Sequence, residues 1–354
     1  MRTGKSIMAL AEELERLQES KRDFVAPTGK LEVVLDSEGA PRIAGLMKEA
    51  PMPIRQSAHR QIAERISIPQ KYYDRMLEDA PDLLVENINH WFHKEPERRM
   101  FRTLEGSVRA VLSDRYRPLD NYELASAVLP VLRESEVEVR SAEVTDTRMY
   151  IQAVQPRMVA EPVKGDVIQA GIALSNSEIG LGSLRIEPLI FRLICLNGMI
   201  AMEAIRKYHI GRRDGGEDDI SELLADETRR LDDAAFWSKA RDLTKASFDR
   251  RFFDRQVERV EKAIGVKVER DVEEVVEVMA TRFVLGEGER KGLLTNLIRD
   301  GATSQWDIVN AMTKLAHTAT DYDRSVELER FGGQVIELPK SEFAKVITAT
   351  APRR

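Results

Sequence analysis

Apolar residues recur at helical spacing in the N-terminal part of the chain. Over residues 5–21 they approach the 3.6-residue period of an amphipathic helix, at Met8, Leu10, Leu14 and Leu17. A short apolar run and three further periodic stretches follow. They predict a strand at 31–35 and helices at 55–65, 69–77 and 82–93.

The middle of the chain changes to short β-prone runs separated by turn residues. Two such runs flank Glu105-Gly106, an arrangement typical of a hairpin. The pattern predicts strands at 98–104 and 107–112, a helix at 122–134, and strands at 137–144, 148–154 and 167–175. Because the links between neighbouring strands are too short for parallel crossovers, we expect an antiparallel sheet.

A nearly all-apolar segment follows at 187–196, broken only by Arg192. Its apolar character on all sides predicts a buried helix, which ends at the turn-forming pair Asn197-Gly198. Beyond it, the pattern predicts helices at 220–248, 251–264, 271–285, 289–299 and 303–323, and then a short strand at 335–338.

This order of elements predicts an α+β fold. We expect an antiparallel sheet, built as hairpin, helix and meander, with helices packed on it and a mainly helical C-terminal region. The expected divisions are an N-terminal helix and strand at 1–54, an α+β core at 55–213, a helical region at 214–330, and a short strand and tail at 331–354.

Composition narrows the class of protein. The 354 residues are 42% hydrophobic and 32% charged, which suits a packed core. No apolar run approaches the roughly 20 residues that span a bilayer, and the N-terminus lacks the apolar core of a signal peptide. Cys195 is the single cysteine, so an intrachain disulfide is excluded. These features predict a cytoplasmic protein that does not contact membranes.

Charge is distributed unevenly along the chain. The net charge of −6 argues against a uniformly basic surface, although it leaves room for a local basic face. Between Glu97 and Asp120, six arginines accompany four acidic residues. Between Asp214 and Asp233, nine acidic residues accompany two arginines.

Familiar catalytic and cofactor motifs are each incomplete. Gly180-Leu181-Gly182 lacks the third glycine of a dinucleotide fingerprint, since Arg185 stands at that position. His90 and His93 lie one helical turn apart, but zinc needs three or four ligands. Cys195 lies in the most apolar segment, where a buried and unactivated thiol is expected. We therefore expect no cofactor and no metal, name no catalytic residue, and lean away from an enzyme.

The arginine-rich hairpin is the strongest candidate for function. Cations with an interleaved aromatic residue suit a phosphate backbone and a stacked base. The candidate nucleic-acid-binding residues are Arg98, Arg102, Arg109, Arg115, Tyr116 and Arg117. The alternative is that these arginines form ion pairs with the acidic residues of the same segment, which are Glu97, Glu105, Asp114 and Asp120.

Four stretches between about 55 and 335 resemble the phage/plasmid-like family built on domain of unknown function 932 (DUF932). They are AHRQIAER at 58–65 with IPQKYY at 68–73, LSDRYRPLDN at 112–121, SNSEIGLGS at 175–183 with CLNGM at 195–199, and WDIVNAMT at 306–313 with His317 and DYDR at 321–324. The resemblance implies a phage, prophage or plasmid context, and it carries over no catalytic residue. The matching positions are Ser113, Asp114, Arg115, Tyr116, Ser177, Glu178, Gly180, Gly182, Asn197 and Gly198. They form either a shared site or determinants of the fold.

Three functions stay open, and we rank them in this order. The first is a non-catalytic nucleic-acid-binding protein that handles single-stranded DNA in annealing, replication or recombination, and that can act as a homo-oligomer. The second is a protein-interaction factor, such as a host-defence antagonist, that uses the acidic 214–233 segment and the C-terminal helices. The third is a metal-dependent nucleotide or nucleic-acid enzyme with Asp114, Asp120 and Glu178 as ligands.

Overall fold

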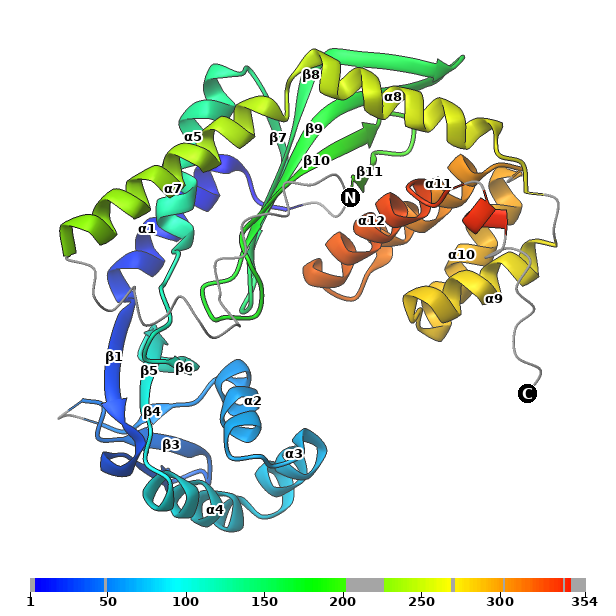
Figure 1. The fold of residues 1–354 in the computed structure, drawn as a ribbon. Helices are drawn as coiled ribbons and strands as arrows, with labels where there is room; N and C mark the ends of the chain where they lie inside the picture. Colours follow the sequence, from blue (N-terminus) through cyan, green and yellow to red (C-terminus); the bar gives the residue numbers. More distant parts are fainter. Residues whose placement is uncertain are drawn as a thin grey trace.

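The computed structural model describes residues 4–47, 50–201, 226–268, 271–301, 303–339 and 341–344. In these ranges the chain folds as α+β, with antiparallel sheets and a helical C-terminal region, as the sequence predicts (Figure 1). The strands are β1 (Arg22–Pro27), β2 (Glu32–Leu35), β3 (Pro41–Ala44), β4 (Met52–Pro53), β5 (Arg98–Leu104), β6 (Ser107–Ser113), β7 (Glu138–Val144), β8 (Met149–Val163), β9 (Asp166–Asn176), β10 (Arg185–Arg192) and β11 (Asn197–Ile200). The helices are α1 (Ile7–Ser20), α2 (Gln56–Arg65), α3 (Gln70–Asp79), α4 (Pro81–Lys94), α5 (Asn121–Glu134), α7 (Asp226–Ala246), α8 (Arg250–Gly265), α9 (Val272–Phe283), α10 (Glu287–Asp300), α11 (Gln305–Lys314) and α12 (Tyr322–Ile336), with 3-10 turns η1 (Thr28–Lys30) and η2 (Leu315–Thr318).

The larger sheet has the order β11-β10-β9-β8-β7 and is antiparallel throughout. Alternate residues of β9 point to opposite faces, as strand geometry requires. Ile172 and Leu174 pack with α1, α5 and α7, whereas Ala173 packs on the other face with Tyr322 at the start of α12. Helices therefore cover both faces of the sheet (Figure 1).

A second sheet, of order β1-β5-β6, carries the arginine-rich hairpin. It packs with α2, α3, α4 and the small β2-β3-β4 sheet around a separate apolar core that includes Phe101 of β5 and Ile62 of α2. Strand β1 pairs antiparallel with β5, so that Pro27 lies opposite Arg98. Residues from the start of the chain thus complete the sheet that holds the hairpin.

The 187–196 segment is a strand and a turn, which corrects the predicted helix. Residues 185–192 form β10 between β9 and β11, and Asn197-Gly198 begins β11 rather than a turn. A strand covered on both faces reads as a continuous apolar run, because neither face needs polar residues. Ile194 and Leu196 lie in the intervening turn and are exposed, each with 58% of its surface accessible.

The C-terminal region is helical, but its internal boundaries differ from the prediction. The expected helix at 303–323 is split into α11, η2 and the start of α12. The expected strand at 335–338 is wrong, since Val335 and Ile336 complete α12 and are buried against other helices. Isolated β-prone residues cannot form a strand without a pairing partner, and here the preceding helix continues through them.

Two sequence predictions fall partly or wholly outside the described residues. Most of the acidic 214–233 segment lies there, as does the start of the helix expected at 220–248, of which 226–246 form α7. Among the described residues, no helix is long and apolar enough to cross a membrane.

Candidate functional site

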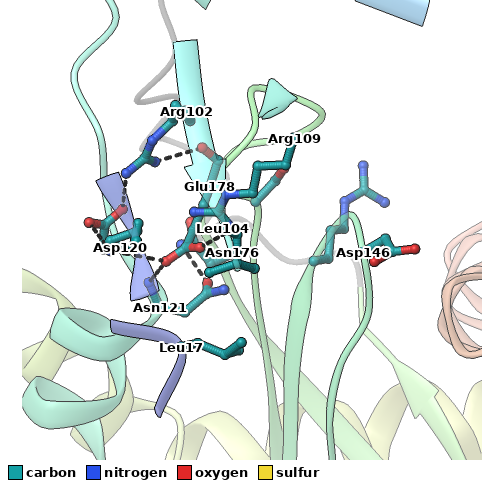
Figure 2. A network of polar contacts seen from close by, with 12 residues as sticks. Leu17, Arg102, Leu104, Arg109, Asp120, Asn121, Asp146, Asn176 and Glu178 are labelled. Carbon is teal, nitrogen blue, oxygen red and sulfur yellow. Dashed lines mark hydrogen bonds and ion pairs between the residues drawn. The ribbon is translucent and has the colours of Figure 1, made fainter. Parts of the chain in front are cut away.

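Arg102, in the middle of β5, is the centre of a buried polar network. Its side chain is fully buried and donates to both carboxylate oxygens of Asp23, each at 3.0 Å. It also donates to Oδ1 of Asp120 at 2.8 Å and to the backbone carbonyl of Glu178 at 2.7 Å (Figure 2). One guanidinium therefore ties together β1, the start of α5 and the loop after β9.

Arg109, on the paired strand β6, joins the same network through Glu178. Its Nη1 lies 2.6 Å from Oε2 of Glu178, whose Oε1 accepts from the backbone N–H of Asn121 at 2.7 Å. Lys21 binds Asp120 directly and lies 3.8 Å from Oε1 of Glu178. Arg109 Nε and Nη2 are buried and have no hydrogen-bond partner among the described residues.

The network is balanced in charge, with three cations facing three carboxylates. Burial alone would raise the pKa of Asp120, but the charges of Arg102 and Lys21 outweigh it and hold that pKa below its ordinary value. Burial opposes the charge of Arg102, but Asp23 and Asp120 outweigh it and raise the arginine's pKa. Arg102 and Asp120 therefore stay charged near neutral pH, and the network has the character of a structural clamp.

The proposed metal ligands do not form a metal site in the described part of the chain. Asp120 and Glu178 do lie together, but their oxygens bind Lys21, Arg102 and Arg109. Asp114 is exposed in the loop after β6. No group of three or more histidine, cysteine, aspartate or glutamate side chains suited to a metal occurs among the described residues.

The resembling stretch at 175–183 forms the turn that covers the end of the hairpin. Ser177 accepts from the backbone N–H of Leu181 at 3.2 Å, and Gly180 has a positive φ of 74°. A Cβ at Gly180 would lie 2.8 Å from Leu112, so glycine is required for both conformation and space. A Cβ at Gly182 would instead meet only the flexible end of Arg148. These positions act mainly as determinants of the fold.

The other resembling positions divide between two parts of the molecule. Ser113 accepts from the backbone N–H of Arg115 at 3.3 Å, which shapes the turn after β6. Asn197 and Gly198 belong to β11, where the Asn197 amide donates to Thr313 of α11 at 2.5 Å. Through Asn197, this pair helps to attach the C-terminal helices to the sheet. Its role is the docking of α11 on the sheet.

The arginines of the hairpin separate into buried and exposed sets. Arg102 and Arg109 are buried in ion pairs, so the structure removes them from the predicted nucleic-acid-binding surface. Arg98, Arg115 and Arg117 are exposed. The ion-pair alternative is thus correct for Arg102.

Tyr116 does not present its ring as a stacking surface. It packs with Leu112 and Ile179, and Gly180 lies against the ring. Its hydroxyl donates to the carbonyl of Ser177 at 3.5 Å, and burial raises the pKa of that hydroxyl. Tyr116 therefore anchors the loop whose flanking arginines are exposed.

The exposed arginines lie at the open end of the hairpin, beside Arg99 and beside two residues that were not candidates from the sequence, Arg65 and Trp91. Arg99 lies opposite Ser113 in the β5-β6 register, and Arg65 at the end of α2 donates to the carbonyl of Val111 at 3.0 Å. Arg65, Arg99 and Trp91 line one pocket of about 340 Å³. Arg65 was missed because it is a helix-terminal arginine, a place where a basic residue needs no further reason. Trp91 was missed because it lies between His90 and His93, a pair that suggested only a metal site.

Comparison with known proteins gives one match. The model of the family described as a domain of unknown function (DUF932) matches residues 108–330, which run from β6 to most of α12. Comparison with curated proteins and with solved structures gives no match. The matched span contains Arg109, Asp120 and Glu178 of the network but not Arg102.

Proposed function

This chain belongs to the DUF932 family, and we propose that it is a non-catalytic protein that binds single-stranded nucleic acid in the replication or recombination of a mobile element. The observation that supports the proposal is the gathering of arginines from three segments at the open end of the β5-β6 hairpin. These arginines are Arg65 on α2, Arg115 and Arg117 on the loop that follows β6, and Arg98 and Arg99, which point to opposite faces of β5 at its first residues.

The buried network supports this binding surface indirectly. Asp120 and Glu178 hold the end of the 114–120 loop and the turn at 177–182 against the hairpin. A loop that is held in place loses less conformational entropy when it binds a flexible strand. The buried arginines thus serve as scaffold, and the exposed arginines make the proposed contact with phosphates.

The chemistry of the exposed set suits a single strand better than a base-specific duplex reader. Guanidinium groups pair with phosphates in either form of nucleic acid, but Trp91 can stack only on a base that is not already stacked in a helix. Binding should therefore be stronger to single-stranded than to double-stranded DNA of the same length.

The test measures binding of the full-length protein to a labelled 30-nucleotide strand of mixed sequence, by fluorescence anisotropy at several salt concentrations. With about three phosphate contacts, the logarithm of affinity should fall with the logarithm of salt at a slope of roughly −2. The double variant Arg115→Gln/Arg117→Gln should bind about tenfold or more weakly and show a shallower slope, because two of those contacts are lost.

A matched control removes the same charge elsewhere. Lys291→Gln/Arg299→Gln changes two exposed cations on α10, whose side chains are 75% and 63% accessible. This control should bind like the wild type. No binding at low salt by folded wild-type protein, or an equal loss in both double variants, would contradict the proposal.

A further inference from the structure

The pocket beside the hairpin is small and is lined by side chains of both charges. Its volume of about 340 Å³ lies at the lower end of the range for ligand pockets, which suits a single nucleoside and not a longer segment. Arg65 and Arg99 contribute cations, Glu95 and Glu97 contribute carboxylates, and Trp91 contributes an aromatic ring. The pocket therefore offers donors, acceptors and a stacking surface together.

The two arginines are not fully neutralised by the acidic residues. Glu97 binds Nη2 of Arg99, yet Nε of Arg99 is buried with no hydrogen-bond partner among the described residues. Burial lowers the pKa of Arg65, and the nearby charge of Arg99 lowers it further. A buried donor without a partner costs free energy, so a ligand that accepts from this guanidinium would be favoured.

Trp91 is held by neighbours on its own helix. The Lys94 ammonium lies 4.7 Å from the centroid of the Trp91 ring, and the His90 ring packs edge-on at 5.3 Å between centroids. These contacts favour one orientation of the indole before any ligand arrives, and a base can stack on the ring face that Lys94 does not cover. A preorganised aromatic ring binds a base at a lower entropic cost.

We propose that this pocket takes one unstacked guanine base from the bound strand, which stacks on Trp91 and is read by Arg99 or Arg65 together with Glu95 or Glu97. The inference rests on the proposed single-strand binding and adds a base preference to it.

Guanine is the base whose edges match a guanidinium beside a carboxylate. Its O6 and N7 accept two hydrogen bonds from one arginine, which is the commonest specific contact to a base. Its N1–H and N2 amino group donate side by side, and a carboxylate accepts both. Adenine and cytosine present an amino group without this combination, and thymine presents no amino group.

A phosphate group fits the pocket less well than a base. Glu95 and Glu97 would repel a phosphate, whereas they can accept from the amino group of a neutral base. The apolar part of the lining, which includes Ile62, Ile66 and Ile68, also suits a flat ring better than an anion.

The test compares 20-nucleotide oligothymidine strands that carry one central dG, dA or dC, bound by the full-length protein. The strand with dG should bind about five- to 150-fold more tightly, the range expected for one well-placed bidentate contact. Glu95→Gln/Glu97→Gln should remove the preference for dG while binding of plain oligothymidine remains. Glu86→Gln, at an exposed position on α4, the helix that carries Trp91, is the control and should keep the preference.

Free nucleosides separate the two proposals. Guanosine should bind the wild type more tightly than adenosine in a calorimetric titration, and Trp91→Leu should weaken guanosine by about fivefold or more. Equal binding of all nucleosides, or a dG preference that survives Glu95→Gln/Glu97→Gln, would overturn the guanine pocket. Guanosine binding without any strand binding would overturn the proposed function and leave the pocket standing.

Discussion

Replacement of Arg102 by methionine tests whether the buried network stabilises the fold. Methionine keeps most of the length of the side chain and removes the guanidinium, so the change is mainly one of charge and hydrogen bonding. Arg102 is fully buried and makes four hydrogen bonds, to Asp23, Asp120 and the backbone of Glu178. All four are lost in the variant.

The size of the loss in stability depends on whether Asp23 and Asp120 can find other partners once the guanidinium is removed. Asp23 is partly exposed, with 30% of its side chain accessible, and can recover contact with water. Asp120 is largely buried, and among the described residues it keeps only Lys21 as a charged partner. Removal of one member of a buried ion pair typically costs about 3–5 kcal/mol, because the remaining charge stays desolvated. We expect Arg102→Met to lower the free energy of unfolding by about that amount.

Urea denaturation followed by far-ultraviolet circular dichroism measures this change. Arg98→Met on the same strand is the control, because Arg98 is exposed and its replacement should change the free energy of unfolding by no more than about 0.5 kcal/mol. A loss below about 1 kcal/mol in Arg102→Met, with an unchanged denaturant slope, would refute the assignment of the network as a structural clamp.

Two further changes test other parts of the fold. Burial lowers the pKa of His59 from 6.5 to about 4, and Nδ1 of its ring lies 2.8 Å from the hydroxyl of Tyr73. Between pH 6.5 and pH 4, His59 is therefore protonated in the unfolded chain but neutral in the folded protein. The free energy of unfolding, measured by urea denaturation, should therefore fall by about 3 kcal/mol as pH drops from 6.5 to 4. A free energy of unfolding that falls just as steeply with pH in His59→Gln would contradict this. In α12, a Cβ at Gly333 would lie 1.8 Å from the carbonyl oxygen of Ile200, so Gly333→Ala should cost about 2 kcal/mol or more. Gly288→Ala, where a Cβ meets nothing within 4 Å, should instead gain about 0.5–1 kcal/mol, and similar melting shifts in both variants would argue against this close packing.

Local patterns were enough to predict most helices and the central strands. The helix at 122–134 and the hairpin at 98–112 match α5 and the β5-β6 pair closely, because each pattern depends on neighbouring residues. Strand β1 was not predicted, since its pairing with β5 joins residues more than 70 positions apart. The nature of β10 was also missed, because a strand and a helix that are buried on all sides share the same apolar composition.

The candidate site shows the same limit in a different form. Asp114, Asp120 and Glu178 were expected from the sequence to be metal ligands if the chain is an enzyme. Asp120 and Glu178 do lie together, but around Lys21, and Asp114 is exposed in the loop after β6. The sequence could not show that Lys21 and Asp23 lie with them, because the contact runs through β1, which no local pattern revealed. If Lys21 and Asp23 are not known to lie there, the sequence cannot distinguish carboxylates neutralised by buried cations from carboxylates that bind a metal.

The alternation of β5 explains why arginines three residues apart have different roles. Arg99 and Arg102 are separated by an odd number of positions, so their side chains point to opposite faces of the strand. On one face, Arg102 meets Asp120 and Glu178 and builds the clamp. On the other, Arg99 lines the pocket with Trp91, on the side where Phe101 joins the core beneath α2 and α4. A count of charges along the sequence does not distinguish these two arginines. The pleat of the strand places Arg102 in the buried network and Arg99 beside the pocket.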